Sequence, residues 1–299
     1  MTKALLILFL FSLITCVPYN KTATLPYTFN AATKITAASK GLIRYFLDFA
    51  GIGYCYDGEY DAKQCAKCPL EKSWVKVASG KENSDKKSYN YIIFKSTTFK
   101  KVVVAVPGTR SGEHMEEFLN SGLKSYGNYK IVKYFKERAD GIRSGVREGL
   151  KKALKNTSGY QVIFTGHSLG GAVSSILALY MYEDGVISTK NSITLITYGQ
   201  PKTGNKAFVD KVMNIAKVFR IVRDNDYVVT ILAIDIPFIN DTEHLGGKIK
   251  LNHDMDQYYV CPYSKRDGYT GNCKNTDLRI IPSHSYLDGN VGLTNYCRS

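Results

Sequence analysis

Short runs of β-branched and aromatic residues alternate along this chain with longer stretches whose hydrophobic residues are spaced for helices. The runs are bounded by polar or glycine-containing segments, which is typical of buried β-strands. Five of them predict strands, at residues 91–94, 102–106, 162–165, 193–198 and 218–223. A weaker strand signal lies at 74–77, within a lysine-rich segment, 72–90, that we otherwise expect to be strand edge and loop.

Four of the intervening stretches predict helices, and one of them lies between Asn205 and the strand at 218–223. An alanine-rich segment at 28–49 is expected to form an opening helix that ends near Gly51, and 172–182 carries enough apolar positions for a buried helix. Residues 129–156 are amphipathic, and their apolar residues recur every four positions, which predicts one buried stripe. That stripe comprises Ile142, Val146, Leu150 and Leu154.

Strands that alternate with helices predict an α/β fold, with a mostly parallel central sheet and helices on both faces. At 299 residues the chain is long for one domain, yet α/β folds of this size are often single. A hydrophobic content of 44% is enough to build one large core. We therefore expect a single domain.

The serine of residues 166–170, Gly-His-Ser-Leu-Gly, stands where the strand at 162–165 gives way to the helix at 172–182. This is the setting of a nucleophile elbow, in which Gly166 and Gly170 leave room for a tight turn and Ser168 is held in a strained backbone. The amide of Leu169 would then point toward a developing oxyanion at the positive end of the helix dipole. The pattern predicts a nucleophilic serine, with His167 inside the elbow.

The N-terminus has the character of a secretory signal peptide. A short charged start precedes an almost wholly apolar stretch at 4–15, which is too short to span a bilayer comfortably. We expect residues 1–16 to be the leader and 17–299 to be the mature domain. No later apolar run reaches membrane-spanning length, and sequons at Asn20, Asn156 and Asn240 suit a glycosylated, extracellular protein.

Removal of the leader also removes Cys16 and leaves six cysteines, Cys55, Cys65, Cys68, Cys261, Cys273 and Cys297. An even number in an exported chain indicates disulfides. The competing interpretation is a zinc site that joins the Cys-x-x-Cys pair at 65–68 to Cys261 and Cys273. The oxidising compartment favours disulfides.

The formal net charge of +14 predicts attraction to anionic surfaces, such as lipid headgroups, acidic polysaccharide or nucleic acid. We find no nucleic-acid motif and no interleaving of aromatic and basic residues of the kind that reads RNA. Many of the basic residues lie on the helix at 129–156, where such a run is usually a solvated face.

A serine nucleophile needs a base to accept its proton and an acid to orient that base. In α/β hydrolases the chain order is serine, acid, histidine. After Ser168 the candidate bases are His244, His253 and His284, and the candidate acids at the end of a strand are Asp224 and Asp226. Spacing alone leaves these alternatives open.

The chain resembles the class 3 lipases, a fungal-lipase-like family of α/β hydrolases that also includes secreted feruloyl esterases. The resemblance runs from about residue 51 to residue 297 and rests on motifs that occur in order. These are Gly108-Thr109, the Thr-Gly-His-Ser-Leu-Gly-Gly block at 165–171, Tyr198-Gly199-Gln200-Pro201 with Gly204-Asn205, Asn225-Asp226 with Val228-Val229, and Ile281-Pro282-Ser283-His284 before Cys297.

This resemblance implies a role for each member of the site. Ser168 would be the nucleophile, Asp226 the orienting acid and His284 the general base, with Thr109 and Leu169 forming the oxyanion hole. It implies no metal or organic cofactor. His244 is similar to a structural histidine of the family, whereas His114, His167 and His253 are interpreted as ordinary polar residues.

The resemblance further implies a lid over the active site at 111–122, which is relatively polar here, and two disulfides. Cys55 with Cys297 would tie the first helix region to the C-terminus, and Cys261 with Cys273 would match a late-loop bridge of the feruloyl esterases. Cys65 and Cys68 remain as a local pair.

We therefore expect a secreted serine ester hydrolase, a lipase that acts on acylglycerols or phospholipids, where an anionic lipid–water interface would suit its charge. A soluble or feruloyl-type carboxylesterase is the alternative with the same chemistry. An acyltransferase shares every catalytic residue. A catalytically inactive, basic surface-binding protein is the alternative from another class.

Overall fold

One large sheet organises the computed structural model of the chain, which describes residues 33–55, 73–84, 87–108, 117–118, 120–187, 193–224, 226–230, 237–252, 256–262 and 273. Nine strands follow one another across it in the order β1-β11-β10-β9-β8-β7-β4-β3-β2. Their bounds are β1 Thr33–Lys34, β2 Val75–Ser84, β3 Lys87–Ser96, β4 Lys101–Val106, β7 Gln161–His167, β8 Ile193–Tyr198, β9 Lys217–Arg223, β10 Lys248–Leu251 and β11 Tyr258–Cys261. A separate hairpin pairs β5 (Leu123–Tyr126) with β6 (Tyr129–Val132).

The central strands run parallel, as the alternation of strands and helices predicts. β4, β7, β8, β9 and β10 form consecutive parallel pairs, and the antiparallel pairs lie toward the two edges. The connecting helices are α1 Ala37–Ile52, α3 Lys133–Leu154, α4 Leu169–Glu183, α5 Lys206–Ile215 and the short α6 Tyr227–Thr230, with 3-10 turns η1 Gly53–Cys55 and η4 Pro237–Ile239. The α/β fold class is thus confirmed.

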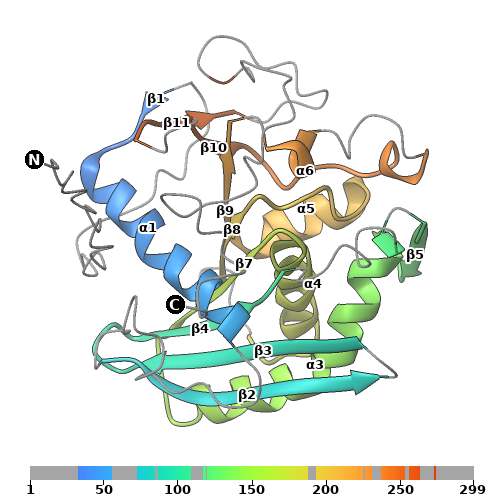
Figure 1. The fold of residues 1–299 in the computed structure, drawn as a ribbon. Coiled ribbons are helices and arrows are strands. Elements are labelled where there is room, and N and C mark those ends of the chain that lie inside the picture. The colour runs from blue at the N-terminus through green and yellow to red at the C-terminus, as the bar shows by residue number, and fades with distance from the viewer. Residues whose placement is uncertain are drawn as a thin grey trace, which may run out of the picture.

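Alternate residues of each strand enter different cores, because successive side chains of a strand point to opposite faces of the sheet. On β4, Val102 and Val104 pack with the residues of α3, α4 and α5, whereas Val103 and Ala105 pack with those of α1. Figure 1 shows α1 on one side of the central strands and α3, α4 and α5 on the other. Both faces of the parallel sheet are therefore covered, which explains its continuous apolar runs.

Two helix starts differ from the sequence-based expectation. α1 begins at Ala37 instead of residue 28, because the Thr36 hydroxyl accepts the Ser39 amide at 3.2 Å and caps the helix there. α3 begins at Lys133 instead of residue 129. The preceding residues 129–132 form β6, whose pairing with β5 satisfies backbone groups that a helix would otherwise have used.

The segment at 72–90 was expected to be strand edge and loop, and this expectation was wrong. It forms β2 and the start of β3, two paired strands of ten residues each. β2 is the outermost strand, so one of its faces and one of its edges stay open to water. Polar residues such as the exposed Lys76 can therefore occupy it, while Val77 and Ala78 pack against the core.

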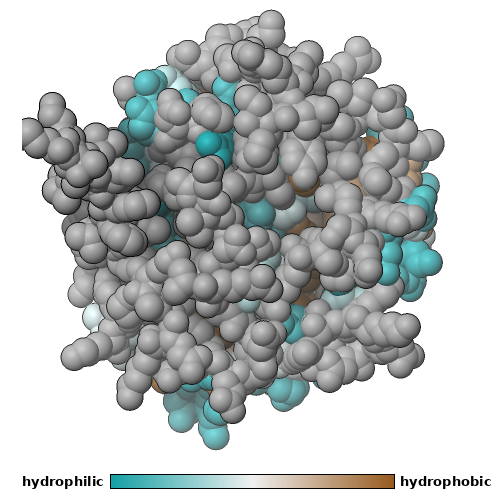
Figure 2. Space-filling view, in the orientation of Figure 1, coloured by the Kyte–Doolittle hydropathy of each residue, from teal (hydrophilic) through white to brown (hydrophobic). Residues whose placement is uncertain are grey.

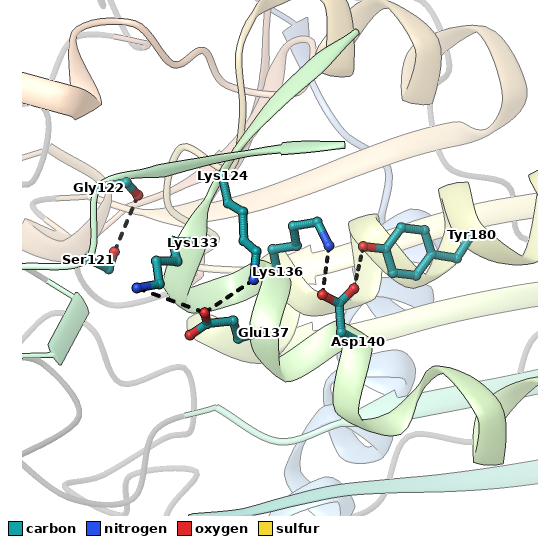
Figure 3. A network of polar contacts seen from close by, with 8 residues as sticks. All are labelled: Ser121, Gly122, Lys124, Lys133, Lys136, Glu137, Asp140 and Tyr180. Carbon is teal, nitrogen blue, oxygen red and sulfur yellow. Dashed lines mark hydrogen bonds and ion pairs between the residues drawn. The ribbon is translucent and has the colours of Figure 1, made fainter. Parts of the chain in front are cut away.

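The predicted stripe on α3 is confirmed, since Ile142, Val146 and Leu150 are at most 3% exposed. The basic face of α3, however, is largely neutralised within the protein. Lys136 donates to Asp140 at 2.6 Å, and the Tyr180 hydroxyl donates to the other oxygen of the same carboxylate at 2.7 Å (Figure 3). Several cations of this face therefore hold the fold together.

Two further ion pairs extend this network beyond α3. The ammonium group of Lys124 in β5 lies 3.5 Å from Oε1 of Glu137 (Figure 3), and this ion pair joins the hairpin to the helix. Arg143 forms a bidentate pair with Asp184, at 2.5 and 3.1 Å, which ties α3 to the end of α4. Where described residues reach the surface in Figure 2, hydrophilic ones are frequent along the margins, and hydrophobic ones show near the centre and at the upper right edge.

The Arg143–Asp184 pair predicts a pH-dependent contribution to stability. The hydrogen bond from Arg143 holds the pKa of Asp184 below its usual value. A depressed carboxyl pKa stabilises the fold above the unfolded pKa of about 3.9, and this contribution is lost as pH falls through the folded value. Asp184→Asn should therefore lower the free energy of unfolding by roughly 1 kcal/mol at neutral pH, and by progressively less below about pH 4.

Urea unfolding at neutral pH and again below about pH 4 measures this effect. Asp210→Asn is the matched control, because Asp210 pairs with Lys206 on the exposed side of α5 and both side chains are more than half exposed. Such a surface pair contributes little. An equal loss for both variants, or a loss for Asp184→Asn that does not change with pH, would contradict the assignment.

Candidate active site

Ser168 occupies the single residue between β7 and α4. Its backbone has φ 56° and ψ −125°, a conformation that is strained for any residue other than glycine. The Ser168 amide donates to the Tyr198 carbonyl of β8 at 2.8 Å, and the Ser168 carbonyl accepts the Gly171 amide at 3.0 Å. The surrounding hydrogen bonds thus hold the serine at the carboxyl end of the central strand, where an elbow is expected.

The glycines on either side of Ser168 are required by the close approach of three backbone segments. A Cβ at Gly166 would lie 2.4 Å from the Gly170 carbonyl carbon, and a Cβ at Gly170 would lie 2.2 Å from the Val106 carbonyl oxygen. Real Cβ atoms do not approach backbone atoms this closely. The elbow therefore packs directly onto the end of β4.

The loop after β4 lies beside the serine. A Cβ at Gly108 would come within 2.6 Å of the His167 carbonyl oxygen and 3.3 Å of the Ser168 Cβ. Thr109, the next residue and a predicted oxyanion donor, lies outside the described residues. Leu169, the other predicted donor, is the first residue of α4, so its amide has no acceptor within the helix and stands at the positive end of the helix dipole.

A contact that the sequence did not indicate joins Tyr54 to the elbow. The Tyr54 hydroxyl lies 2.8 Å from Nδ1 of His167, and both residues are 6% exposed. Tyr54 belongs to η1, directly after α1, and is 113 residues away in the chain. His167, interpreted from sequence as an ordinary polar residue, therefore ties the α1 region to the nucleophile turn.

The two candidate acids after β9 have different surroundings. Asp224 pairs with Lys250 of β10 at 3.1 Å, with both side chains almost fully buried. Asp226 is fully buried, and its Oδ1 accepts the amides of Val228 and Val229 at 3.0 and 3.4 Å. Asp226 therefore sits at the start of α6 with one oxygen occupied by backbone, whereas Asp224 has a charged partner within the sheet.

Ser168 and Asp226 follow strands of the same parallel set. β7 and β9 both flank β8, and His167, Tyr198 and Ile221 are neighbours in register. Both residues consequently lie at the carboxyl edge of the sheet, where open α/β sheets place their functional groups. Of the histidines, His114, His253 and His284 lie outside the described residues.

His244 is placed as a buried side chain. It is 5% exposed, and its pKa lies well below the usual value because of burial and, secondarily, because Arg220, Lys202 and Lys248 are close. A histidine that stays neutral in such surroundings suits the structural role that the resemblance implies.

Cys261 and Cys273 form a disulfide, with their Cα atoms 5.6 Å apart. This is the pairing implied by the resemblance, and it uses two of the four thiols of the alternative zinc site. The Cys55 side chain, Cys65, Cys68 and Cys297 lie outside the described residues. Within the described ranges, no group of three or more His, Cys, Asp or Glu is arranged for a metal ion. Nor do those ranges contain a helix with the length and apolar character needed to cross a bilayer.

Comparisons with known proteins agree with this geometry. The family model "Lipase (class 3)" matches residues 91–236. A secreted mono- and diacylglycerol lipase of Fusarium solani is 22% identical over 77% of this chain and 71% of its own length. A lipase of Rhizopus niveus is 25% identical over 85% of this chain, which spans only 64% of that relative.

One solved structure matches this chain over most of its length. It is a triacylglycerol lipase whose catalytic centre is described as a serine protease triad, and it superposes with a TM-score of 0.71 at 21% identity, over 88% of this chain and 100% of its own. The shared architecture thus extends well beyond the segment that the family model matches. Together with the elbow geometry, these matches show that the chain resembles the class 3 lipases, which are carboxylic ester hydrolases, in sequence over residues 91–236 and in fold over most of its length.

Proposed function

We propose that the protein is a secreted lipase that hydrolyses acylglycerols or phospholipids through Ser168, His284 and Asp226. The observation that carries this proposal is the strained backbone of Ser168 at the strand-to-helix corner, next to the Gly108 loop and the first amide of α4. The apolar leader at residues 4–15 and the likeness to a relative named as secreted support export.

In the proposed reaction, the Ser168 hydroxyl attacks the ester carbonyl while His284 accepts its proton. The amides of Thr109 and Leu169 donate to the oxyanion of the tetrahedral intermediate. His284 then protonates the leaving alcohol, and water attacks the acyl-enzyme by the same route. Asp226 orients His284, and the two backbone amides that Oδ1 of Asp226 accepts hold its carboxylate in place.

A specific observation favours a second candidate, a soluble or feruloyl-type carboxylesterase. The Cys261–Cys273 disulfide is the late-loop bridge that resembles those esterases. The proposed lid at 111–122 is also relatively polar, with Glu113, Glu116 and Glu117. Catalysis would be the same in both cases, so only the physical state of the preferred substrate separates them.

Ser168→Ala tests the proposed chemistry directly. Removal of the nucleophile should lower kcat on p-nitrophenyl esters by roughly 10⁵-fold or more, and unfolding should remain cooperative. The measurement is hydrolysis across a series of acyl-chain lengths, with Ser144→Ala, at an exposed position on α3, as the control. If wild type is inactive on every chain length yet binds anionic vesicles, and Ser168→Ala binds them equally, the protein is a surface-binding protein instead.

A matched pair of substitutions tests the choice of acid. Asp226→Asn should lower kcat by about 10⁴-fold, because the base loses its orienting partner. Asp224→Asn should instead lower stability, since it breaks the buried ion pair with Lys250, and should leave kcat within several-fold of wild type. The reverse pattern in steady-state kinetics and urea unfolding would assign the catalytic role to Asp224.

Interfacial activation tests the substrate class. We expect the rate on a short-chain triglyceride to rise steeply once its concentration exceeds the solubility limit, because a lipase acts on the aggregated substrate. Initial rates on either side of that limit, with a soluble short-chain ester as the control, measure the effect. A rate that saturates below the limit and does not rise above it would support the esterase.

A further inference from the structure

A row of residues crosses the central strands one position before the end of β7. Gly166 pairs with Thr197 of β8, Thr197 with Arg220 of β9, and Arg220 with Lys248 of β10. Phe219 and Ile221 pack on the α1 side of the sheet, so Arg220 points to the opposite side, which α4 and α5 cover. The row therefore places two buried cationic side chains, those of Arg220 and Lys248, on the face of the sheet that the helices cover.

Arg220 is buried without a compensating partner among the described residues. Its side chain is 1% exposed, and none of its Nε, Nη1 and Nη2 atoms has a hydrogen-bond acceptor there. A guanidinium stays charged at any accessible pH, so it does not escape this situation by losing a proton. Burial of an isolated charge is strongly unfavourable, which indicates that an additional group satisfies it.

The buried side chain of His244 likewise lacks hydrogen-bond partners among the described residues. It is 5% exposed, and neither of its ring nitrogens completes a hydrogen bond within the described part of the chain. The backbone of Val229 in α6 approaches the ring without reaching hydrogen-bond geometry. Arg220 and Lys248 are near enough to help lower the pKa of His244, which burial lowers most, so the ring is neutral and carries one N–H donor.

Two acidic residues lie nearby in the chain, Asp224 directly after β9 and Asp226 directly before α6, and both have other contacts. Asp224 pairs with Lys250 at 3.1 Å, and Asp226 accepts two backbone amides at the start of α6. Lys248 itself is 3% exposed. In this region, the N–H groups that lack an acceptor among the described residues are those of Arg220 and His244.

From this arrangement we propose that Arg220, His244 and Lys248 form a buried binding site for a small inorganic anion, namely chloride. A halide accepts several N–H donors at once without preferred directions. The bound chloride would neutralise Arg220 and brace the α6 segment that carries Asp226. It would therefore stabilise the fold beside the active site without taking part in ester hydrolysis.

Bromide replacement locates the anion in the wild-type protein. Crystals grown or soaked in sodium bromide should show an anomalous peak in contact with the guanidinium of Arg220 and the ring of His244. A protein carboxylate in that density, or no peak at Arg220, would overturn the proposal. Because this experiment needs no variant, it remains decisive even if substitution of Arg220 prevents folding.

Thermal unfolding at constant ionic strength gives a second test in solution. When chloride replaces gluconate, each tenfold increase above the dissociation constant should raise Tm by roughly 2 to 3 °C, because the anion binds only the folded state. Arg220→Met should abolish this dependence, whereas Arg223→Met, at the half-buried end of β9, should retain it. Equal slopes for the two variants, or a Tm that does not change with chloride, would count against the site.

Discussion

The close packing of three backbone segments around Ser168 is the constraint on which the rest of the structure depends. The end of β4, the end of β7 and the first turn of α4 meet where side chains would collide, with only 2.2 Å between a Cβ at Gly170 and the Val106 carbonyl oxygen. This contact forces the left-handed backbone of Ser168 and brings the Gly108 loop alongside it. Ser168 and the Gly108 loop are thus positioned by the same packing contact.

The central sheet makes that packing possible by fixing the order of its strands. β7 lies between β4 and β8, so the carboxyl ends of all three come together with the end of β9 close by. Alternation of side chains sends half of each strand toward α1 and half toward α3, α4 and α5. The α1 layer then contributes to the site through Tyr54, which reaches His167 from beyond η1.

Charge is distributed in this protein in two distinct ways. On α3, cations such as Lys136 and Arg143 contact carboxylates and tyrosine rings, so part of the positive charge of this helix is compensated within the fold. Under α4 and α5, by contrast, Arg220 carries a buried charge that the described residues leave without an acceptor. The first arrangement explains why a basic helix need not be a binding surface, and the second is the basis for the proposed chloride site.

The sequence by itself determined the features that depend on neighbouring residues: the apolar strands, the stripe on α3 and the glycine-flanked serine, because periodicity and turn chemistry act over a few positions. It did not find the β2–β3 hairpin or β6, whose polar or short segments become strands only when a partner satisfies their backbone. Only the tertiary structure showed that Tyr54 contacts His167 and that Asp224 forms an ion pair with Lys250. It also showed that Asp226 caps α6 and that Arg220 is buried beside Lys248. Those contacts join residues far apart in the chain, and strand order and register decide them.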